Sequence, residues 1–429
     1  MLDIKLIREN PELVRTNLKK RNDPERLKSL DDLILVDKKW RESQTKLNNL
    51  RSERNELTLE ITKLKKRGKS ATKEIKEANK VADEIKQLEV KVEKHQTEEK
   101  NLLMSIPNLL HESVPIGKDE NSNIEIRKWG KKPEFDFEPK DHLTILKNLG
   151  LIDEERAAKV AGSGFFFLKN ELVLLDSAIQ RFALDFLRKE GFTIVAPPLM
   201  VNKQSYEGVA PLQDFVEMMY KIQDYDLFLI ATAEHPVGAM LINETIDRKE
   251  LPLKFAGVSP CFRKELGAHG KYTKGLFRMH QFNKIEQFVY CHPDDSWSIF
   301  EKIQQNSEKL YQELGLHHRV IEFCSGDLGI MKAKSYDIEV WMADGKFREC
   351  GSNSNLTDYS ARNLNIKWRE GPGKPPAGFV HTLNNTALAT SRTMIAIIEQ
   401  FQQKDGSVII PKVLRPYMNG IEKVEKERR

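Results

Sequence analysis

Cysteine is scarce in this chain of 429 residues, and its four copies stand far apart. No two of them form a CxxC pair, which excludes a disulfide framework and argues against a zinc site. We therefore expect a protein of a reducing compartment, the cytoplasm, in which packing is the role of Cys261, Cys291, Cys324 and Cys350.

Long apolar runs are also lacking. The first residues, MLDIKLIRENPELV, are interrupted by charges, and no later stretch reaches the roughly 18 apolar residues of a membrane span. A Walker-type glycine loop and a parallel strand–helix–strand rhythm are missing as well. Lys and Arg exceed Asp and Glu only by 69 − 64 = 5. The sequence thus predicts a two-domain protein with no membrane partner, in which local clusters of charge matter more than the total.

Proline is absent and glycine occurs once, at Gly68, between residues 30 and 106. Apolar residues there recur in alternating steps of three and four, which is typical of heptad helices. The two series are Leu33, Val36, Trp40, Leu47, Leu50, Leu57, Ile61 and Leu64, then Ala78, Val81, Ile85, Leu88, Val92, Leu102 and Ile106. We expect an antiparallel coiled-coil hairpin over about 30–106, with its tip near residue 68, in which Leu57 pairs with Val81 and Leu50 with Leu88.

The predicted tip is basic, because no acidic residue occurs from Thr62 to Lys73. A run of this kind is often just a solvated helix face. At the far end of a rigid arm, however, positive charge is well placed to reach the phosphate backbone of a nucleic acid. The candidate nucleic-acid contacts are Lys63, Lys65, Lys66, Arg67, Lys69 and Lys73.

Prolines and glycines return after the hairpin, between residues 107 and 139. We therefore predict an N-terminal domain over 1–110, a linker over 111–140 and a larger domain over 141–429. The larger domain mixes amphipathic stretches such as 174–190 with strand-like runs such as 193–196 and 334–341. This pattern favours an α+β fold in which helices flank an antiparallel sheet.

The stretch 259–286, SPCFRKELGAHGKYTKGLFRMHQFNKIE, is unusually charged and lies between two strand-like runs. It is predicted to be the long loop of an antiparallel hairpin, and loops of this length usually have a function. Arg263 suits bidentate contacts to phosphate or carboxylate oxygens, and Glu265 lies on the same side of the strand. Phe282 offers a ring for stacking.

Further along, FRECGSNSN provides Glu349 and Ser352, whose oxygens suit magnesium. Arg392 is a lone cation in the apolar run ALATSRTMIAII and is expected to meet a buried anion. Taken singly, an arginine on a strand is usually half of an ion pair and a phenylalanine is usually core. Taken together, these residues predict a nucleoside triphosphate site on an antiparallel sheet.

Three motifs resemble those of the class II aminoacyl-tRNA synthetases. Arg263-Lys264-Glu265 followed by RMHQFNKIE resembles motif 2 in the form seen in seryl-tRNA synthetases. Residues 187–201, LRKEGFTIVAPPLMV, resemble the dimer-forming motif 1, and residues 388–399 resemble motif 3. The predicted arm is similar to the coiled coil with which seryl enzymes grip the long variable arm of tRNA. The resemblance covers nearly the whole chain and implies a class II catalytic domain in a homodimer.

The resemblance also implies roles in ATP binding. Arg263 would bridge the serine carboxylate and the α-phosphate, Phe282 would stack on adenine, and Arg392 would take the γ-phosphate, so that Arg263 and Arg392 are the catalytic residues. Glu265 and Arg278 would position the adenine and pyrophosphate ends, and Glu349 and Ser352 would hold magnesium. The full ATP set is Arg263, Lys264, Glu265, Arg278, Met279, Phe282, Glu349, Cys350, Gly351, Ser352 and Arg392.

For the amino acid, the stretch ATAE at 231–234 resembles the TxE signature of the family. The implied serine site is Thr232, Ala233, Glu234, Arg263, Glu286 and Thr386. At Thr386 bacterial members commonly carry serine, so this chain keeps the hydroxyl but is closer to the archaeal and eukaryotic branch. A rarer branch binds serine through zinc held by cysteine, and this sequence shows no sign of it.

The implied reaction has two steps, in which L-serine and ATP form seryl-adenylate and the seryl group then passes to the 3′ end of tRNA(Ser). Two alternatives stay open. One is a ligase of the same fold that loads a carrier protein, although such relatives lack the long arm. The other is a catalytically dead RNA-binding relative, against which the intact Arg263, Glu265, Glu286, Glu349 and Arg392 argue.

Overall fold

The computed structural model describes residues 1–210, 218–265 and 275–426. The middle of the predicted charged loop, 266–274, lies outside the described residues. The chain forms two compact units, 1–107 and 108–429. Among the described residues, no helix is both long and apolar enough to cross a membrane.

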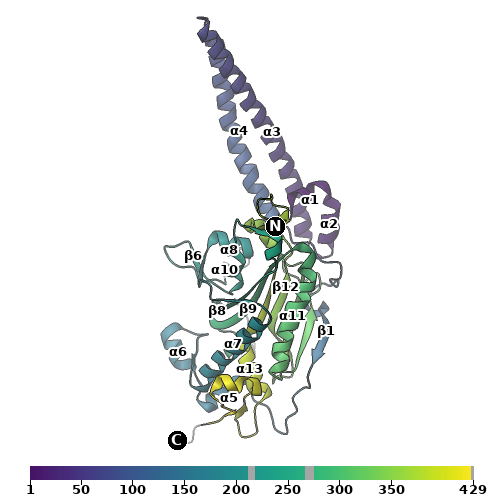
Figure 1. The fold of residues 1–429 in the computed structure, drawn as a ribbon, viewed down its shortest axis with the longest axis vertical. Coiled ribbons are helices and arrows are strands. Elements are labelled where there is room, and N and C mark those ends of the chain that lie inside the picture. The colour runs from purple at the N-terminus through teal and green to yellow at the C-terminus, as the bar shows by residue number, and fades with distance from the viewer. Residues whose placement is uncertain (211–217, 266–274, 427–429) are drawn as a thin grey trace. The chain divides into compact units, whose positions relative to one another are not determined.

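The smaller unit is the predicted helical hairpin with two short helices at its base. The short helices are α1 (Ile4–Glu9) and α2 (Pro11–Lys19), and the arm is made of α3 (Pro24–Lys66) and α4 (Thr72–Ser105). In Figure 1 α3 and α4 lie side by side, and the chain reverses at Gly68, whose φ of 65° suits glycine. The helix α3 begins before the predicted start near residue 30, because Asp23 caps it and Pro24 fits its first turn.

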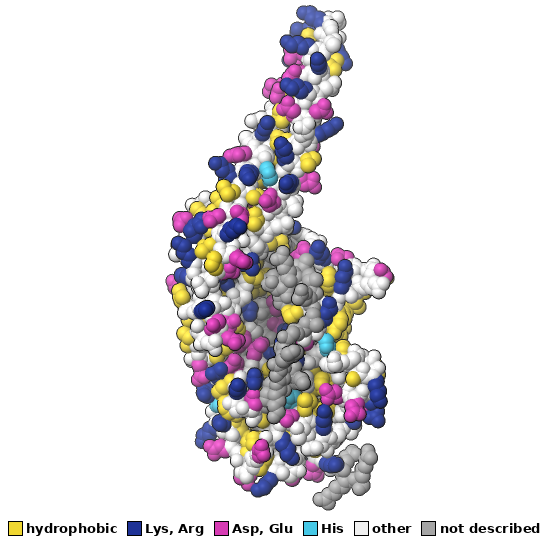
Figure 2. All heavy atoms as spheres, turned by 180° about the vertical axis from the view of Figure 1, so that it is seen from behind, with side chains coloured by type: hydrophobic (Ala, Val, Ile, Leu, Met, Phe, Trp, Pro, Cys, Tyr) yellow, Lys and Arg dark blue, Asp and Glu magenta, His cyan; other side chains and the backbone are white. Residues whose placement is uncertain are grey.

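An apolar seam joins the two helices of the arm. Leu47, Leu50, Val81, Ile85 and Val92 are buried together, and Trp40, Leu57 and Leu88 pack against them. This confirms the antiparallel pairing predicted from the heptad series. The six basic side chains near the tip are all exposed, and Figure 2 shows dark-blue groups gathered at the far end of the arm.

The larger unit is organised by an eight-stranded sheet. In spatial order its strands are β1 (Ile124–Trp129), β10 (His318–Glu322), β11 (Lys334–Trp341), β12 (Phe347–Asn355), β15 (His381–Ala389), β9 (Gln281–Cys291), β8 (Leu253–Phe262) and β4 (Thr193–Val195). β8 and β9 pair antiparallel from Leu253 opposite Tyr290 to Phe262 opposite Gln281. This is the hairpin predicted around the charged loop. One pairing in the sheet, β4 with β8, is parallel.

Part of the predicted linker belongs to this sheet. Residues 124–129 form the edge strand β1, which pairs antiparallel with β10. The alternation of Ile124 and Ile126 with Glu125 and Arg127 is a strand signal. The prediction missed it because the segment is short and the prolines and glycines around it indicate a linker. The expected linker over 111–140 is therefore corrected here, since its central part is a strand of the larger unit.

Helices α7 (Glu171–Lys189), α11 (Ser296–Glu313) and α13 (Thr390–Gln400) pack on the sheet (Figure 1). Gln287 of β9 and Asn385 of β15 donate their side-chain N–H groups to the Ile303 carbonyl and the Ser307 hydroxyl of α11. Side chains alternate along a strand. The neighbouring residues of β9 and β15 therefore face the opposite side of the sheet.

The remaining elements of the described residues are short. The helices are α5 (His142–Leu149), α6 (Glu154–Ala161), α8 (Lys203–Val209), α10 (Glu234–Ala239) and α12 (Tyr359–Leu364), with 3-10 turns at Glu120–Ser122, Arg248–Glu250, Gly275–Phe277, Pro293–Asp295 and Lys412–Met418. The small sheets pair β14 (Gly378–Phe379), β13 (Lys367–Arg369) and β7 (Thr245–Asp247); β16 (Val408–Ile409) and β17 (Lys423–Val424); β2 (Ile152–Asp153) and β3 (Phe167–Leu168); β5 (Met200–Asn202) and β6 (Leu227–Leu229). All four cysteines are buried and unlinked.

Candidate active site

A cavity of about 290 Å³ opens on the face of the sheet opposite α11. It brings together most of the residues predicted for serine, which come from three separate parts of the chain. These are Thr232, Glu234, Arg263, Glu286 and Thr386. Ala233, the remaining predicted member, does not line the cavity, because it is fully buried at the start of α10.

The antiparallel register of β9 and β15 places Glu286 directly opposite Thr386. The Thr386 hydroxyl donates to Oε2 of Glu286 at 3.4 Å, and Nζ of Lys284 lies 2.6 Å from the same oxygen. From the same strand as Thr386, Nδ2 of Asn384 donates to Oε1 of Glu234 at 2.7 Å. The cavity therefore presents two carboxylates, Glu234 and Glu286, each held by a hydrogen-bond donor of β15.

The Glu234 carboxyl has an unusual ionisation. Burial, and then the negative charge of Glu286, raise its pKa from 4.5 to about 7, although Lys284, Lys332 and Arg263 act in the opposite direction. An ammonium ion bound between Glu234 and Glu286 would relieve their repulsion and favour the charged form. The site is thus suited to a small molecule that carries a positive amine.

Arg263 stands between this cavity and a second, smaller one. Its Nε donates to the Ala231 carbonyl at 3.3 Å, and its guanidinium carbon lies 5.3 Å from the centre of the Phe282 ring. Its backbone N–H donates to the His280 carbonyl at 3.0 Å, which extends the β8–β9 pairing by one step. These contacts fix the guanidinium at the boundary of the two spaces, where one group can serve two anions.

The smaller cavity, of about 50 Å³, gathers most of the residues predicted for ATP. Those that line it are Arg263, Glu265, Met279, Phe282, Glu349, Cys350, Gly351 and Arg392. Arg278 and Lys264 are outside its lining. Nε of Arg278 lies 3.1 Å from Oε2 of Glu265, so these two predicted residues form an ion pair with each other. Ser352 lines the larger cavity.

Arg392, at the start of α13, meets an anion as the sequence led us to expect, but this anion, Glu349, is half exposed and not buried. Its Nη1 donates to the Glu349 carbonyl at 2.9 Å and lies 3.1 Å from Oε1 of the same residue. The positive charge of Arg392 holds the pKa of the Glu349 carboxyl below its usual value, although desolvation by the surrounding protein acts in the opposite direction. The Glu349 side chain is still 49% exposed, because it faces the open cavity. An ionised carboxylate and the nearby Ser352 hydroxyl are oxygen donors of the kind that magnesium prefers.

Five polar residues of the larger cavity were absent from the prediction: His235, Lys284, Lys332, Ser354 and Asn384. Lys284 and Asn384 each stand two residues before a predicted serine contact on the same strand, so alternation along β9 and β15 was a usable signal. Lys332 comes from the turn before β11, and its Nζ lies 3.4 Å from the Ser352 hydroxyl. Nothing in the sequence around Lys332 indicates this position.

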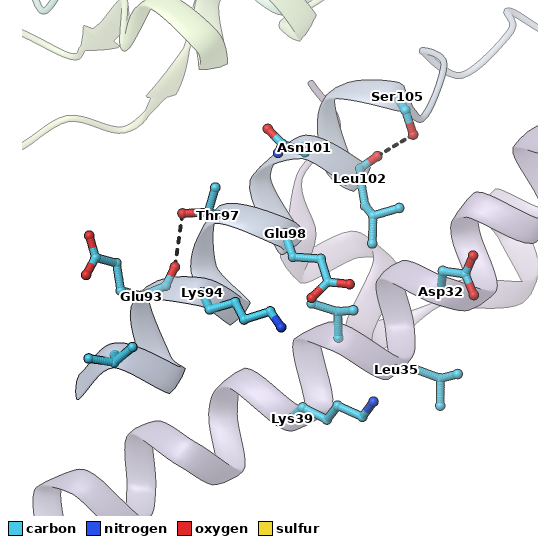
Figure 3. Close-up of a pocket in the computed structure, with 12 residues that line it drawn as sticks. Asp32, Leu35, Lys39, Glu93, Lys94, Thr97, Glu98, Asn101, Leu102 and Ser105 are labelled. Atoms are coloured by element: carbon cyan, nitrogen blue, oxygen red, sulfur yellow. Dashed lines mark hydrogen bonds between the residues drawn. The ribbon is translucent and has the colours of Figure 1, made fainter. Parts of the chain in front are cut away.

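A wider groove, of about 1080 Å³, lies on the arm between α3 and α4. Figure 3 shows side chains of both helices, among them Lys39 of α3 and Glu98 of α4, projecting into the space between them. Its hydroxyl groups are satisfied locally, since Thr97 donates to the Glu93 carbonyl and Ser105 to the Leu102 carbonyl. None of the basic residues predicted to bind nucleic acid lines this groove.

The hairpin β8–β9 with its arginine, and the strand β15 leading into α13 with a second arginine, define a class II aminoacyl-tRNA synthetase core. In agreement, residues 219–401 match the family "tRNA synthetase class II core domain (G, H, P, S and T)". Residues 1–110 match the "Seryl-tRNA synthetase N-terminal domain".

Full-length relatives narrow the assignment. A serine–tRNA ligase of Methanocella arvoryzae is 52% identical over 98% of this chain and 100% of its own. The crystal structure of seryl-tRNA synthetase from Pyrococcus horikoshii complexed with ATP superposes with a TM-score of 0.93, at 47% identity over all of both chains. The cytoplasmic serine–tRNA ligase of Naegleria fowleri in complex with AMP gives a TM-score of 0.88, at 34% identity over 100% of this chain and 99% of that one. The chain belongs to the seryl-tRNA synthetase family of aminoacyl-tRNA ligases.

Proposed function

We propose that this protein activates L-serine with ATP and transfers the seryl group to tRNA(Ser). The observation that carries the proposal is the single cavity in which two carboxylates, a hydroxyl and Arg263 converge. That set matches the ammonium, the hydroxyl and the carboxylate of serine. The cavity adjoins a pocket lined by Phe282 and Arg392, which suit a nucleotide.

In the first step, a carboxylate oxygen of serine attacks the α-phosphorus of ATP. A new P–O bond forms, the bond to the bridging oxygen breaks, and pyrophosphate leaves with the electron pair. No general base is required, because the serine carboxylate is already ionised at neutral pH. Catalysis then depends on position and on charge placed against the developing phosphorane. Arg263 is placed to contact both the serine carboxylate and the α-phosphate.

The nucleotide is held by residues of the smaller pocket together with Arg278, which pairs with Glu265 at its edge. Phe282 stacks on the adenine, Glu265 and Arg278 position its two ends, and Arg392 takes the γ-phosphate. The Pyrococcus relative was crystallised with ATP. Magnesium would be held by Glu349 and Ser352 and would neutralise charge on the phosphates. The lowered pKa of Glu349 keeps that ligand ionised at neutral pH.

Serine is selected by the floor of the larger cavity. Its ammonium binds between Glu234 and Glu286, and its hydroxyl reaches the Thr386 hydroxyl. The carboxylates favour an amine, and the threonine hydroxyl favours a substrate that can hydrogen-bond to it. Both Glu286 and Thr386 are more than nine-tenths buried, so an analogue without the hydroxyl would leave a polar group unpaired.

In the second step, the 3′-hydroxyl of the terminal tRNA nucleotide attacks the seryl carbonyl and AMP leaves. We assign the grip on tRNA to the exposed basic tip of the arm. Six positive side chains with no acidic residue between them in the sequence suit a phosphate backbone. They are Lys63, Lys65, Lys66, Arg67, Lys69 and Lys73.

We further propose a homodimer that works in the cytoplasm. Large apolar side chains of motif 1 and its surroundings are exposed in the single chain, namely Val173, Leu174, Ile194, Leu199 and Met200. Exposed apolar patches of this kind often mark an interface, and a symmetric dimer buries each patch twice. Four unlinked cysteines agree with a reducing compartment.

The test is a serine-dependent exchange of pyrophosphate into ATP, followed by charging of defined tRNA(Ser). We expect both reactions with serine. Pyrophosphate exchange together with loading of a carrier protein instead of tRNA would identify the carrier-protein ligase. Absence of exchange with retained RNA binding would identify the catalytically dead relative.

A further inference from the structure

Asn108 is a buried residue of the larger unit. Its side chain and its backbone N–H form hydrogen bonds to residues that line one side of the serine cavity. It is 2% exposed. Its Nδ2 lies 3.0 Å from the Met331 carbonyl, 2.8 Å from the Leu356 carbonyl and 3.0 Å from the Thr357 hydroxyl. Its backbone N–H donates to the Ile330 carbonyl at 2.7 Å. Asn108 itself does not line the cavity, but three of these partners, Ile330, Met331 and Leu356, do.

The wall that Asn108 holds is the turn 329–332, which has no regular secondary structure of its own. The turn ends in Lys332, whose Nζ lies 3.4 Å from both the Ser352 and the Ser335 hydroxyls. Lys332 lines the same cavity as Glu234 and Glu349. A shift of the turn would therefore move the Lys332 ammonium relative to both Glu234 at the serine end and Glu349 at the nucleotide end of the site.

The other partner of Asn108 is conformationally strained. Thr357 has a φ of 49°, in the left-handed region that a β-branched residue rarely adopts. Its hydroxyl meets Nδ2 of Asn108, and its backbone N–H donates to Oδ1 of Asn355. Such a conformation persists only where the surroundings fix it, and Asn108 supplies part of that constraint.

We propose that Asn108 is a positioning residue for serine activation: it fixes the turn 329–332 and thereby the Lys332 ammonium. The inference rests on the proposed function, because serine is the ligand whose binding it affects. Asn108 acts through the wall and touches no substrate, so its loss should affect the serine end of the site more than the nucleotide end.

The experiment measures serine-dependent pyrophosphate exchange in the full-length protein carrying Asn108→Ala. We expect the KM for serine to rise about tenfold while the KM for ATP changes by less than about twofold, as for loss of one buried hydrogen-bonding group. In a Lys332→Met background, the same Asn108→Ala change should alter the serine KM by less than about twofold, because the charge to be positioned is gone.

A matched control is Gln402→Ala. Gln402 is also buried, and its side-chain amide also donates to two backbone carbonyls, those of Lys140 and Glu399, away from the cavity. The control should lower the melting temperature and leave the serine KM unchanged. Thr357→Val, which removes only one partner of Asn108, gives a milder variant if Asn108→Ala does not fold, with an expected rise of about threefold in serine KM.

The outcomes separate the two claims. Exchange by the parent protein with an unchanged serine KM in Asn108→Ala and in Thr357→Val would overturn the inference alone. Equal rises in the KM for serine and for ATP, or full additivity with Lys332→Met, would assign Asn108 a purely structural role and would also overturn it. Absence of serine-dependent exchange in the parent protein would overturn the proposed function itself.

Discussion

The arm and the larger unit, called the catalytic unit below because it contains the active site, use positive charge in opposite ways. On the arm, the basic side chains near Gly68 are exposed, and no acidic residue stands between them in the sequence. In the catalytic unit, Lys284 is 6% exposed and paired with Glu286, and Arg392 is held by Glu349. Exposed charge acts at a distance and is screened by salt, whereas buried charge acts over one contact and depends on exact placement. The two regions should therefore respond differently to the same kind of substitution.

The largest effect is expected at the boundary of the two cavities. Arg263→Ala should reduce pyrophosphate exchange about 10² to 10³-fold, because one preorganised cation is lost where charge develops. Exchange rates and thermal melting of the variant and its parent provide the measurement. Arg156→Ala is the control, because Arg156 is exposed and pairs only locally with Asp153. Exchange within threefold of the parent would show that Arg263 is misassigned.

A smaller loss is expected at the serine hydroxyl contact. Thr386→Val should lower the kcat/KM for serine about 10- to 100-fold and leave the KM for ATP nearly unchanged. The serine hydroxyl loses its partner, and the buried Glu286 carboxylate loses a hydrogen-bond donor. The ratio of serine to alanine activation is the quantity to measure. Thr382→Val serves as the control, since Thr382 is buried on the same strand but does not line the cavity. An unchanged ratio in Thr386→Val would argue against this contact.

At the tip of the arm the effect should fall on tRNA alone. Changing Lys65, Lys66, Arg67 and Lys69 to Ala should raise the KM for tRNA about tenfold and flatten its salt dependence, since each lost phosphate contact removes somewhat under one unit of slope. Exchange and helicity should stay at the parent level, because the apolar seam is untouched. Titrations of charging rate against tRNA at several salt concentrations measure both quantities.

The control for the tip is an equal number of exposed lysines elsewhere on the arm. Lys80, Lys86, Lys91 and Lys94 are exposed on α4, among acidic neighbours. Their change to Ala should alter the tRNA KM less than the tip variant does. The same loss in both variants would mean that only the total charge of the arm matters.

The smallest effect is a shift in pH dependence. Glu234 binds an amine as a carboxylate, and its pKa of about 7 means that protonation weakens the site as pH falls. The kcat/KM for serine should therefore decline below about pH 7 and level off above it. Glu286→Gln removes the neighbouring negative charge and should move the midpoint to lower pH, besides reducing activity. A midpoint that stays in place would show that Glu286 does not set the ionisation of Glu234.

The arm could be predicted from the sequence almost completely, and the reason is physical. Its contacts repeat every few residues, so the spacing of Leu47, Leu50, Val81 and Ile85 determines the seam. The hairpin β8–β9 could also be predicted, because two strand-like runs flank one loop. The edge strand β1 was missed, since its partner β10 is far away in the chain and the prolines and glycines around β1 indicate a linker.

The active site was predictable only in part. Charged residues in strand-like and apolar runs indicated Arg263, Glu349 and Arg392 as candidates. Their convergence in one site depends on the order of the strands in the sheet, which no local sequence pattern predicts. The serine residues Thr232, Glu234, Glu286 and Thr386 came from the resemblance to seryl-tRNA synthetases. Neither the sequence pattern nor the resemblance predicted Lys332, because it lies in an irregular turn that long-range hydrogen bonds hold in place.

The central claim is that the arm serves tRNA and the cavity serves chemistry. It can be tested by removing residues 54–84 and joining Glu53 to Ile85 through a short glycine linker, which keeps Leu47, Leu50 and Val92 in the seam. The direct measurement compares serine-dependent pyrophosphate exchange with tRNA(Ser) charging in this shortened protein. The account predicts exchange within about twofold of the parent and charging reduced at least about tenfold, because the lost contacts are electrostatic contacts to phosphate. Equal losses in the two reactions would contradict it and would mean that the arm supports the fold or the dimer instead.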